Sequence, residues 1–139
     1  MVPNAEIVTI DRNPEMIELA KKNLGKYDHR NQIILKEGDA ADILKELSGS
    51  FDVIFMDSAK SKYIEFLPIA LDLLSENGVI LMDDIFQGGE ILTPIMEIKR
   101  NQRALERGLR KLFDEVLDNP KYLTSILPLG DGLLMIKKA

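Results

Sequence analysis

The sequence predicts an α/β protein with a Rossmann-like, doubly wound and mostly parallel sheet that ends in an antiparallel hairpin. Short apolar strands alternate with helical segments, and two of the strands end on acids: residues 51–56 precede Asp57, and residues 78–82 precede Asp83. Strand–helix–strand units form right-handed crossovers, which place consecutive strands parallel. Two final β runs joined by a short, turn-rich connection are typical of a hairpin.

Each predicted element has a local signal. Residues 5–10 alternate and are rich in β-branched side chains, which predicts a strand. Asn13 and Pro14 predict the cap and first position of a helix that ends at Gly25. The remaining predicted elements are strands at 33–35, 51–56, 78–82, 122–127 and 133–136, with helices at about 41–47, 62–74 and 92–117.

Composition favours one ordinary water-soluble domain over residues 1–139. The chain has a net charge of −5 and no cysteine, so disulfides and thiolate metal sites are excluded. It contains no apolar run of about 18 residues and no signal-peptide pattern at its start. We therefore expect a cytoplasmic protein that does not cross a membrane.

The chain begins almost directly on a strand that ends at the acidic Asp11. In nucleotide-binding α/β folds such an acid follows the second strand and bonds ribose hydroxyls, downstream of a glycine-rich turn. No G-x-G-x-x-G occurs in the sequence, and its one G-x-G is at residues 130–132, in the predicted hairpin. We therefore expect an N-terminally truncated domain whose first strand is missing, with unpaired strand edges and exposed apolar surface.

The predicted functional residues follow the two acid-ended strands. Ligands of open α/β sheets bind outside the carboxyl ends of the strands. Asp57 and Lys60 follow the first of these strands, and Asp83 with Asp84 follows the second. Carboxylates and an amine at this edge are better suited to chemistry than to supporting a core.

These residues resemble the cation-dependent class I O-methyltransferases, a family that includes caffeoyl-CoA and catechol O-methyltransferases. The resemblance covers nearly the whole chain, and its most specific part is D-x-x-K-x-x-Y followed by a strand that ends in two acids. The matching segments are Asp11, residues 37–40, residues 51–60 with Tyr63, residues 79–84 with Gly88 and Gly89, and residues 129–132.

The resemblance implies S-adenosylmethionine as the methyl donor. Asp11 would accept hydrogen bonds from the ribose hydroxyls. Asp39 and Ala40, which follow Gly38, would contact the adenine, and Asp57 would lie near the amino group of the donor.

The resemblance also implies a divalent cation such as Mg²⁺, bound by Asp57, Asp83 and Asp84, which would lower the pKa of an acceptor hydroxyl. Asp84 stands where relatives usually have asparagine, which adds a negative charge. Lys60 matches the general base of the family, a role that requires a lowered pKa. Tyr63 would flank the acceptor.

A basic segment offers a second surface. Residues 95–112 carry a net charge of +4, whereas the rest of the chain is acidic. This segment is either a solvated helix face or a patch for RNA phosphates, with Arg100, Arg103 and Arg107 as the contacting residues. It is similar to bacterial family members that methylate 5-hydroxyuridine at the tRNA wobble position. We favour that acceptor slightly over a catechol-like small molecule.

Plainer interpretations stay open. Asp39 is also a suitable helix cap, Asp57 a strand-end cap, and Lys60 an ordinary surface lysine. An NAD-dependent oxidoreductase would use Asp11 equally well, but it needs no trio of carboxylates. A truncated sheet is also compatible with a non-catalytic binding fragment, with weak donor binding, and with a homodimer that covers the open sheet.

Overall fold

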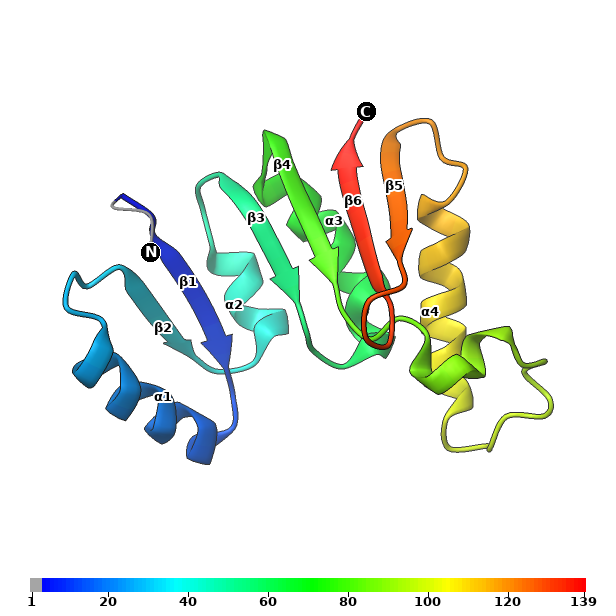
Figure 1. Ribbon diagram of the computed structural model, residues 1–139, viewed down its shortest axis with the longest axis horizontal. Helices are drawn as coiled ribbons and strands as arrows, with labels where there is room; N and C mark the ends of the chain where they lie inside the picture. Colours follow the sequence, from blue (N-terminus) through cyan, green and yellow to red (C-terminus); the bar gives the residue numbers. More distant parts are fainter. Residues whose placement is uncertain (1–3) are drawn as a thin grey trace. The chain divides into compact units, whose positions relative to one another are not determined.

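The computed structural model describes residues 4–139 and divides the chain into two compact units, up to residue 47 and from residue 48 onward. The sequence predicts a single domain. Helices and strands alternate in both units (Figure 1), which confirms the predicted α/β class. No helix in the described part of the chain is both long and apolar enough to cross a membrane.

The first unit is a strand–helix–strand–helix arrangement: β1 (Ile7–Asp11), α1 (Pro14–Tyr27), β2 (Ile33–Glu37) and α2 (Ala40–Glu46). β1 and β2 pair in parallel, with Asp11 opposite Glu37 at their carboxyl ends. The side chain of Asn13 accepts hydrogen bonds from the backbone N–H groups of Glu15 and Met16, as the predicted cap requires. α1 continues two residues beyond Gly25, where the sequence predicts its end.

The second unit contains a four-stranded sheet. Its elements are β3 (Phe51–Met56), η1 (Lys60–Lys62), α3 (Tyr63–Leu73), β4 (Leu74–Met82), η2 (Gln87–Leu92), α4 (Arg103–Val116), β5 (Tyr122–Leu127) and β6 (Leu133–Lys138). The strand order is β3-β4-β6-β5. β3 and β4 are parallel, whereas β6 is antiparallel to both of its neighbours, which confirms the closing hairpin.

The helix predicted from about residue 92 begins only at Arg103. Thr93 is extended (ψ 138°) and precedes Pro94, a position that disfavours helical backbone. The Arg103 guanidinium donates to the backbone carbonyls of Met96 and Ile98 in the non-helical segment that replaces the predicted first turns. Basic residues that the sequence placed on one helix therefore lie partly on this segment.

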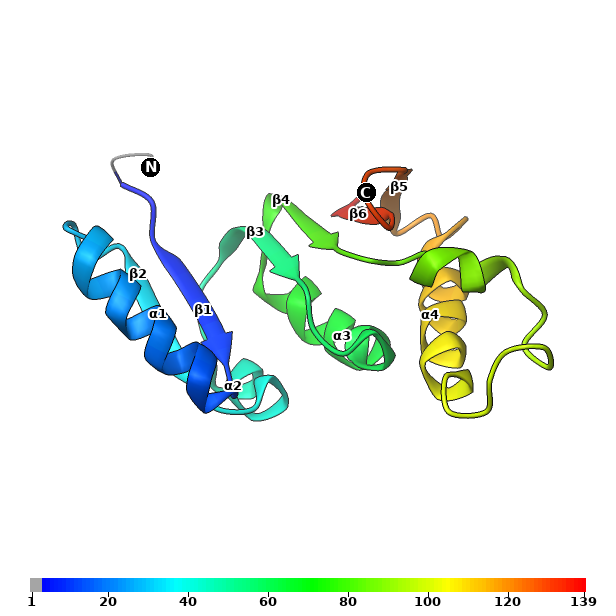
Figure 2. The same cartoon turned by 60° about the horizontal axis from the view of Figure 1, so that its bottom comes forward.

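The two faces of the second sheet differ in burial. α3 and α4 cover one face (Figure 2), where Ile80, Met82, Leu134 and Ile136 are completely buried. On the opposite face Val53 and Phe55 of β3 are both 58% exposed. β3 is also an edge strand whose one neighbour in the sheet is β4. The predicted exposed apolar surface is therefore present in this unit, and homodimerisation through it stays a prediction.

Helix α4 buries a carboxylate. Glu106 has 0% exposure, and neither of its side-chain oxygens has a hydrogen-bond partner. Burial raises the pKa of Glu106 above its ordinary value of 4.5; the nearby positive charge of Arg110 opposes this shift, and the negative charge of Glu90 adds to it. The ionised form of Glu106 is therefore unfavourable in the folded protein.

Replacing Glu106 with glutamine is expected to raise the free energy of unfolding at pH 7 by about 1 kcal/mol. A raised pKa means that the folded state binds the proton more tightly than the unfolded state, so ionisation weakens the fold as the pH rises above 4.5. The gain should disappear near pH 4, where the carboxyl group is protonated. Urea unfolding at both pH values measures this, with Glu115→Gln on the exposed face of α4 as the control. An equal gain at both pH values would contradict the prediction.

Candidate active site at the ends of β3 and β4

The carboxyl ends of β3 and β4 lie next to each other. The register of the pair places Met56 opposite Met82, so the acids that follow both strands emerge at one edge of the sheet. The backbone N–H of Asp83 donates to the carbonyl oxygen of Met56 at 3.0 Å, which continues the pairing by one residue. The structure thus brings Asp57, Asp83 and Asp84 to a shared edge, as the sequence predicts.

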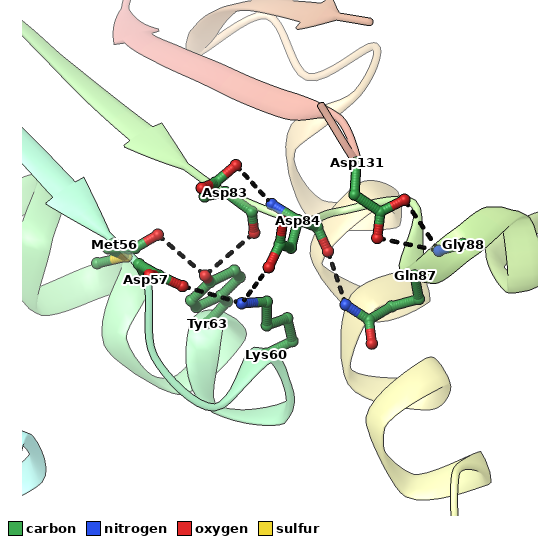
Figure 3. Close-up of polar contacts among 9 residues, drawn as sticks. All are labelled: Met56, Asp57, Lys60, Tyr63, Asp83, Asp84, Gln87, Gly88 and Asp131. Atoms are coloured by element: carbon green, nitrogen blue, oxygen red, sulfur yellow. Dashed lines mark hydrogen bonds and ion pairs between the residues drawn. The ribbon is translucent and has the colours of Figure 1, made fainter. Parts of the chain in front are cut away.

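Lys60 lies between two of these acids. Its Nζ atom is 3.1 Å from Oδ1 of Asp57 and 3.3 Å from Oδ2 of Asp84. The Lys60 side chain is 13% exposed, whereas the two carboxylates are 58% and 47% exposed. Figure 3 shows both carboxylates directed at the ammonium group. The 3-10 turn η1 positions Lys60, because it brings the chain back towards the sheet edge immediately after Asp57.

The environment of Lys60 keeps it protonated in this arrangement. Burial lowers the pKa of Lys60, but the hydrogen bond that Lys60 donates to Asp57 and the interactions with Tyr63 and Asp84 raise it more, so its pKa lies above the ordinary value of 10.5. A general base near neutral pH needs a lowered pKa. The structure therefore shows Lys60 as the cation of an ion-paired cluster, and its role as a base stays a prediction.

The fit of a divalent cation differs among the three predicted ligands. Asp57 and Asp84 suit one, because their carboxylates already contact the same positive group. Asp83 is oriented differently: its Oδ1 accepts a hydrogen bond from the backbone N–H of Asp84 at 2.9 Å, on the far side of the backbone from Lys60 (Figure 3). Within residues 4–139 no three acidic or histidine side chains are grouped so that they could hold a metal ion.

The Tyr63 side chain connects the two strands that carry the candidate site. Its ring is completely buried, and its hydroxyl lies 2.9 Å from the carbonyl oxygen of Met56 and 3.2 Å from that of Asp83. One side chain thus links the ends of β3 and β4. In the described conformation Tyr63 is a structural residue, and contact between Tyr63 and an acceptor stays a prediction.

Four of the predicted donor-binding residues lie in the first unit, at the ends of β1 and β2: Asp11, Gly38, Asp39 and Ala40. The fifth, Asp57, follows β3 in the second unit. The backbone N–H of Gly38 donates to the carbonyl oxygen of Asp11 at 2.9 Å, which places Asp11 beside the turn formed by residues 38–40. Asp39 caps α2 through the N–H of Ala41, and it forms a 2.8 Å ion pair with Arg12. The plainer interpretation of Asp39 as a cap is confirmed, and a contact between Asp39 and adenine stays a prediction.

The three arginines predicted to contact RNA are not equivalent. Arg103 is partly buried and bonds to backbone carbonyls, whereas Arg100 and Arg107 are exposed. Arg110, which the sequence did not single out for a role, donates to the carbonyl oxygens of Ile91 and Thr93. Two arginines therefore hold the segment before α4, and two are available to solvent.

Two site residues were not assigned a role from the sequence. Nε2 of Gln87 donates to the backbone oxygen of Asp84 at 2.7 Å, and the carboxylate of Asp131 accepts from the N–H of Gly88. The turn at residues 130–132 is visible as a G-D-G signal. The sequence gives no signal that Gly88 is the partner of Asp131, because 43 positions separate the two residues.

A cavity of about 740 Å³ lies elsewhere in the second unit, between α3, the end of α4 and the first residues of β5. Its lining includes Leu67, Leu71, Glu115 and Tyr122, but no predicted site residue. The candidate site is therefore the exposed edge around Lys60.

The sequence of residues 1–139 matches the family profile described as O-methyltransferase. The chain belongs to the O-methyltransferase family. The chain is 32% identical over 142 residues to the O-methyltransferase ankF of Aspergillus thermomutatus, covering 95% of this chain and 59% of that protein. It is 31% identical over 93 residues to a catechol O-methyltransferase of Niastella koreensis, covering 64% of this chain and 42% of that protein.

The fold of the chain is similar to the crystal structure of the SAH-bound methyltransferase PaMTH1 of Podospora anserina. The TM-score is 0.83 at 32% identity, and the match covers 97% of this chain and 61% of that one. These findings confirm the family resemblance and the Rossmann-like fold class. The chain spans about three fifths of the length of the curated relatives it matches most fully.

Proposed function

We propose that the protein is an S-adenosylmethionine-dependent O-methyltransferase that methylates one oxygen of a vicinal pair on its acceptor. The observation that supports this most strongly is the Asp57–Lys60–Asp84 cluster at the ends of two parallel strands, in a chain of this family. Methyl transfer breaks the bond between the sulfonium and its methyl group and forms a bond from that methyl group to the acceptor oxygen, whose proton must leave. Charged groups fixed at one place can orient that oxygen and accept its proton.

We further propose that Asp57 and Asp84 hold a divalent cation such as Mg²⁺. When bound, such a cation lowers the pKa of an acceptor hydroxyl and orients it. The two carboxylates are suited to this because both already face one positive group. Asp83 supports the same edge through its bond to the Asp84 amide, and Asp83 would have to turn to become a third ligand.

The first unit would hold the ribose and adenine of the donor. Asp11 offers a carboxylate at the end of β1, and the turn at Gly38, Asp39 and Ala40 lies beside it. Calorimetry with S-adenosylhomocysteine and with NAD separates this proposal from the oxidoreductase alternative. Binding of NAD but not of S-adenosylhomocysteine would refute it.

Two acceptors fit this proposal. A catechol-like small molecule is supported by the similarity to a catechol O-methyltransferase. The 5-hydroxyuridine of a tRNA, which the sequence analysis favours slightly, is supported by the exposed Arg100 and Arg107 on the basic segment. Replacing both arginines with glutamine should weaken tRNA methylation strongly and leave catechol methylation unchanged, because only an RNA brings phosphates to them.

Removing the cation is expected to lower methyl transfer by about 100-fold, as is Asp57→Ala, because the acceptor hydroxyl then keeps its ordinary pKa. Transfer of a labelled methyl group to catechol and to tRNA is measured with Mg²⁺, with chelator, and with Mg²⁺ restored. Asp72→Ala, an exposed acid on α3, is the matched control and should retain activity. Activity that is indifferent both to chelator and to Asp57→Ala would remove the metal from the proposal.

A further inference from the structure

The turn between β5 and β6 is bound to the segment that follows β4. The backbone N–H of Phe86 donates to the carbonyl oxygen of Asp131 at 2.8 Å, and that of Ile85 donates to Gly132 at 3.1 Å. The N–H of Gly88 donates to both carboxylate oxygens of Asp131, each at 2.9 Å (Figure 3). The hairpin turn thus holds residues 85–88 by backbone and side-chain contacts.

The contact between the two segments is too close for a side chain on Gly132. A Cβ atom at this position would lie 2.6 Å from Cδ2 of Phe86, and the backbone of Gly132 has a φ of 87°. Both the left-handed conformation and the aromatic ring against the backbone require glycine here. The segment therefore has little freedom to slide along the turn.

The bound segment begins next to the Asp57–Lys60–Asp84 cluster, and several of its residues have positive φ angles. Asp84, Gln87, Gly88 and Gly89 have φ values of 54°, 50°, 61° and 90°. A left-handed conformation is uncommon for residues other than glycine, and it persists only where the surrounding structure fixes it. Two neighbouring parts of the structure hold the backbone of Asp84 in this conformation. The end of β4 at Asp83 lies on one side, and the segment bound by the hairpin turn lies on the other. The hydrogen bond from the Gln87 side chain to the backbone carbonyl of Asp84 adds a third constraint.

We propose that Asp131 is a positioning residue for the site: its carboxylate holds the segment after β4 so that Asp84 keeps the conformation in which it contacts Lys60. This inference rests on the proposed function for its catalytic consequence, but not for its structural basis. Asp131 acts through Gly88 and the backbone of residues 84–88, and Asp84 is the residue that reaches the cluster.

The proposal makes a distinctive kinetic prediction. Asp131→Ala should lower kcat by about 10- to 100-fold, because misplacing a catalytic group by about 1 Å has effects of that size. Donor affinity should change much less than kcat, since Asp131 is not among the residues predicted to bind the donor. Asp131→Asn should retain most of the activity, because an amide oxygen can still accept a hydrogen bond from the N–H of Gly88.

A second readout reports directly on the cluster. Brief acetylation of the whole chain, followed by mass spectrometry, measures how accessible the Lys60 amine is. Asp131→Ala should increase labelling of Lys60 several-fold, and Asp131→Asn should not. Labelling of Lys62, which pairs with Glu65 on the surface, provides the internal reference. Asp114→Ala, an exposed acid on α4, is the matched control and should change neither labelling nor kcat.

The outcomes separate this inference from the proposed function. Methyl transfer by the unaltered chain, together with an Asp131→Ala variant that keeps its kcat or its Lys60 labelling, overturns the positioning role. An Asn variant as impaired as the Ala variant also overturns it, because the accepted hydrogen bond is then not what matters. No transfer to catechol or to tRNA, together with altered Lys60 labelling, refutes the proposed function and leaves the positioning role supported.

Discussion

Replacing Lys60 with methionine is expected to lower methyl transfer by about 10²- to 10⁴-fold, the usual contribution of a positioned acid or base. Lys60 is the one basic side chain described in contact with Asp57 and Asp84, and it is mostly buried between them. Methionine keeps much of the length and apolar character of the side chain but removes its charge and its proton. The two carboxylates would then lose the ammonium group that lies between them. Steady-state transfer to catechol with Mg²⁺ measures the loss.

Lys60→Arg distinguishes the roles that this residue can have. Arginine keeps the positive charge between the carboxylates but does not give up a proton in proteins. If Lys60 accepts the acceptor proton, Lys60→Arg should fold normally and stay inactive. Lys62→Met is the matched control, because Lys62 pairs with Glu65 and is exposed. Wild-type rates in Lys60→Met would show that the cluster takes no part in the reaction.

Replacing Gly108 with leucine is expected to lower the free energy of unfolding by about 2 kcal/mol, since overpacking a tight contact costs about 1–3 kcal/mol. α4 packs against η1, and a Cβ atom on Gly108 would lie 3.0 Å from Cα of Ser61 and 3.1 Å from its carbonyl oxygen. Backbone atoms cannot move aside as a flexible side chain can. The strain would therefore reach Lys60, the neighbour of Ser61, and activity should fall together with stability.

Helix propensity alone would predict the opposite change in the free energy of unfolding. In an exposed helix interior, replacing glycine with a good helix former gains about 1 kcal/mol. Ala104→Leu on the exposed face of α4 introduces leucine into the same helix away from the contact with Ser61. It should change the free energy of unfolding by less than about 0.5 kcal/mol. Urea unfolding of both variants provides the comparison. A Gly108→Leu protein as stable as the wild type would show that α4 and η1 are not held together closely.

Local signals predicted most of the fold. Asn13 and Pro14 marked the start of α1, and the apolar runs before Asp57 and Asp83 marked β3 and β4, because each signal lies within a few residues of its effect. The start of α4 was predicted about ten residues too early. Apolar residues continue at helical spacing N-terminal to Arg103, and this spacing extended the predicted helix too far. Pro94 disfavours helical backbone at Thr93, and α4 begins only at Arg103.

The candidate site was predicted as a set of residues but not as an arrangement. That Asp57 and Asp84 face the same place follows from the parallel register of β3 and β4. That Lys60 lies between them depends on the turn η1, and the orientation of Asp83 depends on the left-handed backbone of Asp84. Spacing in the sequence carries no signal for either. The contact from Gly88 to Asp131 joins segments that only the completed sheet brings together.

The uncovered side of the β3-β4-β6-β5 sheet has a consequence inside a cell. Sheets with parallel strands normally carry a layer on both sides. Within the second unit α3 and α4 cover the other side, and Val53 and Phe55 are exposed. Such a surface attracts chaperones and proteases that recognise incompletely assembled polypeptides. The exposure of Val53 and Phe55 is therefore expected to lower the abundance of the protein in a cell.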